Sequence, residues 1–146
     1  MTDIHSCAAD ELTAAQLYAV LRLRVDVFVV EQECPYPELD GRDLLPGTRH
    51  FWFADGGDPE EVTGYLRVLR EPGGALRIGR VCTATSVRGS GLGARLMTAA
   101  MEYAGEVPCV LEAQTYAQGF YARFGFVPEG EEYLEDGIPH ITMWRR

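Results

Sequence analysis

The chain of 146 residues contains no lysine and no asparagine, so all thirteen of its basic residues are arginines. A P-loop needs the lysine of the pattern G-x-x-x-x-G-K-[ST], and this class of nucleotide site is therefore excluded. The basic residues are also outnumbered, because 22 acidic residues give a formal net charge of −9. Nucleic-acid backbones are bound by basic surfaces, so we expect no nucleic-acid partner.

Cysteine and histidine are scarce, and neither is arranged as metal ligands would be, so we expect no metal site. The residues concerned are Cys7, Cys34, Cys82, Cys109, His5, His50 and His140. No C-x-x-C pair occurs, and no basic segment followed by an apolar run opens the chain. Both features predict reduced thiols in a cytoplasmic protein. No apolar run approaches the ~20 residues that span a bilayer, so we expect no membrane partner.

The length and a content of 47% hydrophobic and 24% charged residues predict a single globular domain over residues 1–146. Thr13 and Gln16 fit a capping box, so a helix is predicted from there to about Val30. Its apolar residues at helical spacing are Leu17, Leu21, Val25 and Phe28. The next segment, Glu31–Asp43, holds two prolines, a glycine and five acids, and we expect it to be irregular and too polar for the core.

The remaining chain alternates strand and helix patterns. Strands are predicted at 49–55, 61–70, 73–84 and 108–114, with a turn at 56–60. A helix before the last of these carries one apolar face, made of Leu92, Leu96, Ala99, Ala100 and Tyr103. A short helix ends at Gly125, before a further strand, and residues 131–144 form a hairpin that turns at Asp136-Gly137. This order predicts an α/β fold with one central sheet.

The stretch SVRGSGLGARLM, residues 86–97, places three glycines between a strand and a helix N-terminus. The first amides of a helix have no intrahelical partners, so such a loop suits a phosphate or pyrophosphate. Arg88 can add a charge-assisted hydrogen bond. GSGLGA also satisfies the looser dinucleotide fingerprint, with Glu112 near the expected ribose-binding position. Too few residues follow for a second strand–helix–strand unit, which counts against that alternative.

The pattern R-x-x-G-x-G, formed by Arg88, Gly91 and Gly93 and followed by FYARFGF at 120–126, resembles the GNAT superfamily of N-acetyltransferases. The stretches at 21–43, 78–83, 120–126 and 135–141 resemble its ElaA-like branch in the same order and at the same spacing. This resemblance implies the GNAT fold, a mixed and mostly antiparallel sheet flanked by helices. It also implies acetyl-CoA as cosubstrate and direct transfer to a primary amine in a ternary complex.

The same resemblance assigns roles to residues around the glycine loop. The coenzyme pyrophosphate would be held by Arg88, Gly89, Ser90, Gly91, Leu92, Gly93 and Ala94. The pantetheine arm would pair with the strand ending at Val81, Cys82 and Thr83, while the strand ending at Gln114 splays away. The family that this chain resembles usually has asparagine where Gln114 stands. Tyr121 would donate a proton to the leaving thiolate, as a phenol that stays protonated at neutral pH can.

The general base stays open among Glu112, His50, His140, Glu31, Glu33 and water. A cysteinyl intermediate at Cys82 is disfavoured, because no histidine is placed to activate it. The acceptor is expected to be an amine-bearing small molecule or peptide. It would be cationic if the acids at Glu31–Asp43 and Glu129–Asp136 rim the cleft rather than form solvated loops. The alternatives are a non-catalytic coenzyme A-binding module and a nucleotide-binding domain, and the oligomeric state is left open between monomer and homodimer.

Overall fold

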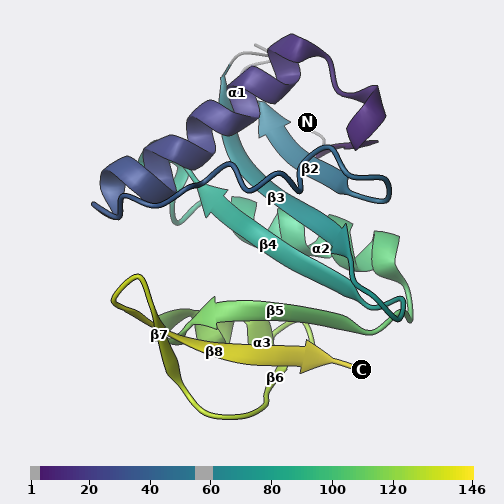
Figure 1. The fold of residues 1–146 in the computed structure, drawn as a ribbon, viewed down its shortest axis with the longest axis vertical. Helices are drawn as coiled ribbons and strands as arrows, with labels where there is room; N and C mark the ends of the chain where they lie inside the picture. Colours follow the sequence, from purple (N-terminus) through teal and green to yellow (C-terminus); the bar gives the residue numbers. More distant parts are fainter. Residues whose placement is uncertain (1–3, 55–60) are drawn as a thin grey trace.

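A computed structural model describes residues 4–54 and 61–146, in which one eight-stranded sheet carries helices on both faces (Figure 1). The strand order is β1-β2-β3-β4-β5-β8-β6, with β7 paired to β8. The strands are β1 His5–Ala8, β2 Arg49–Ala54, β3 Val62–Arg70, β4 Leu76–Thr83, β5 Cys109–Gln114, β6 Val127–Pro128, β7 Tyr133–Glu135 and β8 Ile138–Arg145. The helices are α1 Ala14–Val25, α2 Leu92–Ala104 and α3 Gln118–Ala122. The predicted fold, a mixed and mostly antiparallel sheet flanked by helices, is confirmed.

The observed elements match the expected order except for one added strand. The predicted strands and helices are present within a few residues of their expected bounds. Strand β1 was not predicted, because it is short, lies at the sheet edge and buries little of its surface. The turn expected at 56–60 lies outside the described residues. None of the helices in the described ranges has the length and apolar character that crossing a bilayer requires.

Helix α1 begins as predicted but buries a different face. The Thr13 hydroxyl accepts a hydrogen bond from the Gln16 amide, and the Gln16 side chain accepts one from the Thr13 amide. The expected apolar stripe is only half buried, and the buried positions are Ala19, Val20, Leu23, Arg24 and Val27. The α-helix ends at Val25 and continues as a π-helical turn over Asp26–Glu31. The buried face is rotated from the expected one because Arg24 points inward and pairs with Glu38 and Asp43. The spacing of apolar residues does not reveal such a pairing.

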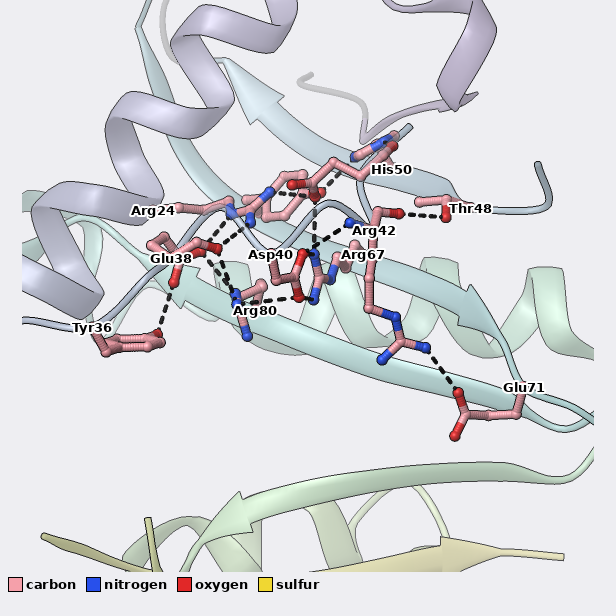
Figure 2. A network of polar contacts seen from close by, with 12 residues as sticks. Arg24, Tyr36, Glu38, Asp40, Arg42, Thr48, His50, Arg67, Glu71 and Arg80 are labelled. Carbon is pink, nitrogen blue, oxygen red and sulfur yellow. Dashed lines mark hydrogen bonds and ion pairs between the residues drawn. The ribbon is translucent and has the colours of Figure 1, made fainter. Parts of the chain in front are cut away.

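The polar segment Glu31–Asp43 was expected to be too polar for the core, and this expectation is wrong for two of its side chains. Its Glu38 and Asp43 carboxylates are buried rather than solvated, and both contact the fully buried Arg24. Figure 2 shows the contact between Glu38 and Arg24. Buried carboxylates are stable only when paired and hydrogen-bonded, and the arginines of α1 and the sheet supply those partners. The segment is therefore an irregular layer packed on the sheet by ion pairs.

Helix α2 packs on the face of the sheet opposite α1. Its buried residues are Leu92, Leu96, Met97, Ala100 and Ala104. Tyr103, expected on this face, is 42% exposed and touches the ring of Phe51 edge-on. Gly64 of β3 permits the close approach, because a Cβ there would lie 2.7 Å from the Leu92 side chain. Of the aromatic residues around α3, only Phe126 is fully buried, whereas Phe120 and Phe124 are half buried.

Strands β4 and β5 separate after a short parallel contact. Their paired register contains only Leu76 with Cys109 and Arg77 with Val110. Beyond Arg77 the β5-facing edge of β4 has no strand beside it in the described structure. On its other edge, β4 carries a bulge opposite β3, where Arg80 has a left-handed φ of 55°. The divergence and the bulge together shape the site described next.

Candidate active site

A cleft of about 850 Å³ follows the divergence of β4 and β5. Its lining comes from β4, the glycine loop, α3, the polar segment after α1 and the β7–β8 hairpin. The sequence-predicted residues that line it are Glu31, Val81, Cys82, Thr83, Arg88, Gly89, Gly91, Leu92, Gly93, Ala94, Glu112, Gln114, Tyr121 and His140. Ser90 does not line it, since its hydroxyl donates to the Val87 carbonyl. The fold thus brings together residues that lie far apart in the sequence.

Backbone conformation explains two of the three glycines of the loop. Gly89 and Gly91 have φ values of 83° and 84°, a left-handed backbone that side chains resist. A Cβ at either position would meet nothing within 4 Å, so the space before these amides is open. Gly91 is the N-cap of α2, whose first amides lack intrahelical partners. Gly93 has no left-handed φ, and a Cβ there would lie 3.5 Å from the Phe120 ring, an ordinary van der Waals contact.

Arg88 is engaged by the protein itself. Its guanidinium donates to both carboxylate oxygens of Glu31 and, through Nη2 and Nε, to the Thr83 carbonyl at 2.9 and 3.2 Å. The hydrogen bonds from Arg88 lower the pKa of Glu31. The pair therefore ties the end of the α1 helical run to the end of β4. A bound pyrophosphate would compete with Glu31 for this guanidinium.

The unpaired edge of β4 offers backbone groups to an extended ligand. A chain that pairs with such an edge gains main-chain hydrogen bonds as an added strand would. Cys82 on this strand is 5% exposed, and burial raises the pKa of its thiol well above the ordinary value. A thiol held neutral is a poor nucleophile, which argues against a cysteinyl intermediate.

Tyr121 enters the cleft from α3. Its ring packs edge-on against Phe120 and Phe126, at centroid distances of 5.1 and 6.5 Å. Burial raises the pKa of its hydroxyl, so the phenol stays protonated at neutral pH. Within the described part of the chain the hydroxyl has no hydrogen-bond partner, which leaves its proton available to a ligand.

The candidate bases differ sharply in their surroundings. Glu112 accepts hydrogen bonds from Tyr133 and Thr142 at 2.5 Å and from Arg77 at 2.7 Å. Burial alone would raise the pKa of Glu112, but these three donors outweigh it and hold the pKa below its ordinary value. A carboxylate so occupied has little capacity to take a further proton. Its contacts fit a residue that positions the cleft wall.

Three other candidates lack a free position in the cleft. His50 is fully buried between the Tyr65 hydroxyl at 2.5 Å and the Asp43 carbonyl at 2.9 Å, and it does not line the cleft. The expectation of His50 as a base is therefore wrong. Glu33 lies outside the lining and Glu31 is paired with Arg88.

His140 lines the cleft from β8, opposite Gln114 of β5 in the register. Its Nδ1 lies 2.7 Å from the Ile138 carbonyl, which can only accept, so Nδ1 carries the hydrogen. In the neutral ring Nε2 then holds a lone pair, and the Glu135 carboxylate lies 3.9 Å from it. Stacking on Tyr133 fixes the ring plane. His140 is thus the candidate whose basic atom is unoccupied.

Further cleft residues were not singled out from the sequence. Arg67, Arg77 and Arg80 lie on β3 and β4 and reach the cleft. A signal was present, because LRVLR and LRIGR place arginines inside strands that otherwise read as buried. Such arginines require acidic partners, and the acid-rich segment before them supplies most of these.

The comparisons with known proteins agree with this geometry. Residues 24–146 match the acetyltransferase (GNAT) domain family. Protein ElaA of Escherichia coli is 43% identical, with 98% of this chain and 94% of that protein covered. A crystal structure of an acyl-CoA N-acyltransferase from Pseudomonas aeruginosa superimposes with a TM-score of 0.92 at 42% identity, covering all of both chains. The crystal structure of E. coli ElaA gives a TM-score of 0.92 at 39% identity, also over both whole chains.

Proposed function

The chain belongs to the GNAT acetyltransferase family, and from that premise we propose that it transfers an acetyl group from acetyl-CoA to a primary amine. Transfer is direct, within a ternary complex. The observation that carries the proposal is the convergence of three features on one cleft. These are the open left-handed glycine loop at the start of α2, the unpaired edge of β4 and the Tyr121 hydroxyl.

The coenzyme follows these features in order. Its pyrophosphate takes the open amides between Arg88 and Ala94, where the helix dipole favours negative charge. Its pantetheine arm runs along Val81–Thr83 as an added strand. The bulge at Arg80 interrupts the ladder with β3, and a backbone N–H group that it turns toward the open edge of β4 polarises the thioester carbonyl.

Proton movements then involve two side chains on different walls of the cleft. His140 Nε2 removes a proton from the acceptor ammonium, which gives the neutral amine that attacks the thioester carbon. As the C–S bond breaks, Tyr121 donates its proton to the departing thiolate. Glu112 positions Arg77, Tyr133 and Thr142 and takes no proton itself. We propose a cytoplasmic location, which the free thiols of all four cysteines support.

The experiment that tests this function measures release of free coenzyme A thiol from acetyl-CoA with a panel of amines. Acyl transfer predicts amine-dependent thiol release and an acetylated product of matching mass. Tight binding of coenzyme A without release for any amine would instead indicate a non-catalytic binding module. His140→Gln tests the base, because loss of the general base is expected to lower kcat/KM for the amine while acetyl-CoA still binds.

A further inference from the structure

One wall of the cleft is built from arginines and carboxylates, and we call it the arginine wall. Its lining side chains are Tyr36, Asp40, Arg42, Arg67, Arg77 and Arg80, and Glu38 and Glu71 hold them from behind without lining the cleft (Figure 2 shows all but Arg77). Arg67 and Arg80 both contact the Asp40 carboxylate, and Arg42 and Arg77 both contact that of Glu71. Shared carboxylates thus hold these guanidiniums together in two pairs.

Every carboxylate oxygen of the wall already accepts at least one hydrogen bond. Glu38 accepts from Tyr36 at one oxygen and from Arg24 and Arg80 at the other, each at 2.7 Å. Asp40 accepts from Arg67 at both oxygens, at 2.9 and 2.5 Å. Glu71 accepts from Arg77 at one oxygen and from Arg42 at the other, at 2.8 and 3.1 Å. The acids that suggested a cationic acceptor are therefore already neutralised here.

The guanidiniums, by contrast, keep unused donors. Arg80 donates through Nε and Nη2 and leaves Nη1, while Arg77 donates through Nε and Nη1 and leaves Nη2. The Arg42 side chain donates only through Nη2. No other described residue takes these N–H groups, and the three side chains are 21%, 27% and 40% exposed. This wall can therefore offer unused hydrogen-bond donors. Its charges balance, because Asp43 and Glu112 also pair with Arg67 and Arg77, and Arg24 pairs with Glu38.

A hollow lies among these side chains. Gly79 stands on β4 between Arg77 and Arg80 and faces Arg67 in the register with β3. A Cβ at Gly79 would meet nothing within 4 Å, and its φ lies outside the left-handed region. The glycine is therefore not required by the backbone and leaves the floor of the cleft open beside the arginines.

Resting on the proposed function, we propose that the amine acceptor carries a carboxylate, as a free amino acid does. The carboxylate binds the unused N–H groups of Arg42 and Arg77, which share Glu71, because charge-assisted donors in a partly buried site favour an anion. On the opposite wall, Glu135, Asp136 and His140 line the cleft and face the amine. The two walls thus complement the two ends of a zwitterion.

The test compares each standard amino acid with its α-amide and with spermidine as acetyl acceptors. We expect kcat/KM for the acid to exceed that for its amide by about tenfold or more, since the amide loses the charge-assisted contacts. Spermidine is expected to be the poorer acceptor. Preference for the amides or for spermidine would overturn the proposal and leave acetyl transfer intact.

Two variants and a matched control test whether the acid-over-amide preference arises at the arginine wall. Arg42→Gln should remove most of the acid-over-amide preference, because it removes donors to the carboxylate. The fold should survive, since Arg42 has a single exposed ion pair to lose. Gly79→Leu should fill the hollow and lower kcat/KM for the acid while acetyl-CoA still raises the melting temperature. Arg146→Gln, which also loses one exposed ion pair but lies outside the cleft, should keep the preference.

The outcomes separate this proposal from the function on which it rests. An unchanged preference in Arg42→Gln, or an unchanged kcat/KM for the acid in Gly79→Leu, would overturn the assignment of the arginine wall. Transfer to simple amines with none to any amino acid would also overturn it. Failure to bind acetyl-CoA or to acetylate any amine would contradict the proposed function itself.

Discussion

Removing the Tyr121 hydroxyl tests one proposed step, the donation of a proton to the departing thiolate. Tyr121→Phe keeps the ring and its contacts with Phe120 and Phe126, so stability and acetyl-CoA affinity should barely change. We expect kcat to fall by roughly 10²-fold, within the usual range for a general acid. Pre-steady-state thiol release with a true acceptor measures this. A wild-type rate when chemistry limits turnover would leave Tyr121 a packing residue only.

A substitution at Glu31 tests whether its ion pair with Arg88 competes with the coenzyme pyrophosphate. Because Glu31 holds the guanidinium that a pyrophosphate would take, Glu31→Gln should tighten acetyl-CoA binding several-fold, as expected when one competing ion pair is lost. The measurement is calorimetric titration. Binding of pantetheine, which lacks the pyrophosphate, should not change.

Glu33→Gln is the matched control for this prediction, since it removes the same charge nearby and Glu33 does not line the cleft. An equal gain in Glu33→Gln would reveal only a general effect of net charge. Weaker binding in Glu31→Gln would mean that the pair organises the site instead of competing for it.

At the scale of elements, the glycine loop is the part most sensitive to side chains. Gly91→Val should abolish acetyl-CoA binding, since a β-branched residue resists the φ of 84° and places its side chain before the amides. Gly73→Val is matched to it, with a φ of 92°, open space and a position outside the cleft. Both variants should lose stability, but only Gly91→Val should lose binding. Normal binding by Gly91→Val would exclude this loop as the pyrophosphate site.

The polar segment after α1 makes stability depend on pH through Asp40. Burial would raise the pKa of Asp40, but hydrogen bonds from Arg67 and the Arg42 amide lower it. A carboxyl with a lowered folded pKa stabilises the native state above its unfolded pKa, about 3.9, and loses that contribution as the pH falls through the folded pKa. The stability difference between wild type and Asp40→Asn should therefore be constant above about pH 5 and shrink below about pH 4. Urea unfolding across this range measures it, and a difference that grows toward acid would contradict the assignment.

The elements differ in how well their residues predict them. The capping box at Thr13 and the hairpin turn at Asp136-Gly137 are local, and both are present as predicted. The burial of Glu38 and Asp43 was not predictable from their own segment, because it depends on Arg24 and on the sheet arginines. Among the candidate bases, spacing could not separate His50 from His140, since the difference lies in which strand position faces the cleft.

At the scale of the whole molecule, the early parting of β4 and β5 is the feature that makes a coenzyme site. A sheet paired along its full length would have no open edge beside Val81–Thr83. The ordered motifs of the sequence predicted this arrangement through their resemblance to a family, whereas periodicity alone predicted only a mixed sheet. Membership of that family is shown by the match over residues 24–146.

The most direct test of this account is the effect of three ligands on the free energy of unfolding. Acetyl-CoA, NAD and ATP are each added at equal concentration to the same protein. A ligand that binds only the native state stabilises it by about 2.7 kcal/mol at one hundred times its Kd. We predict that acetyl-CoA raises the unfolding free energy and that NAD and ATP leave it unchanged. Stabilisation by NAD or ATP with none by acetyl-CoA would contradict the account.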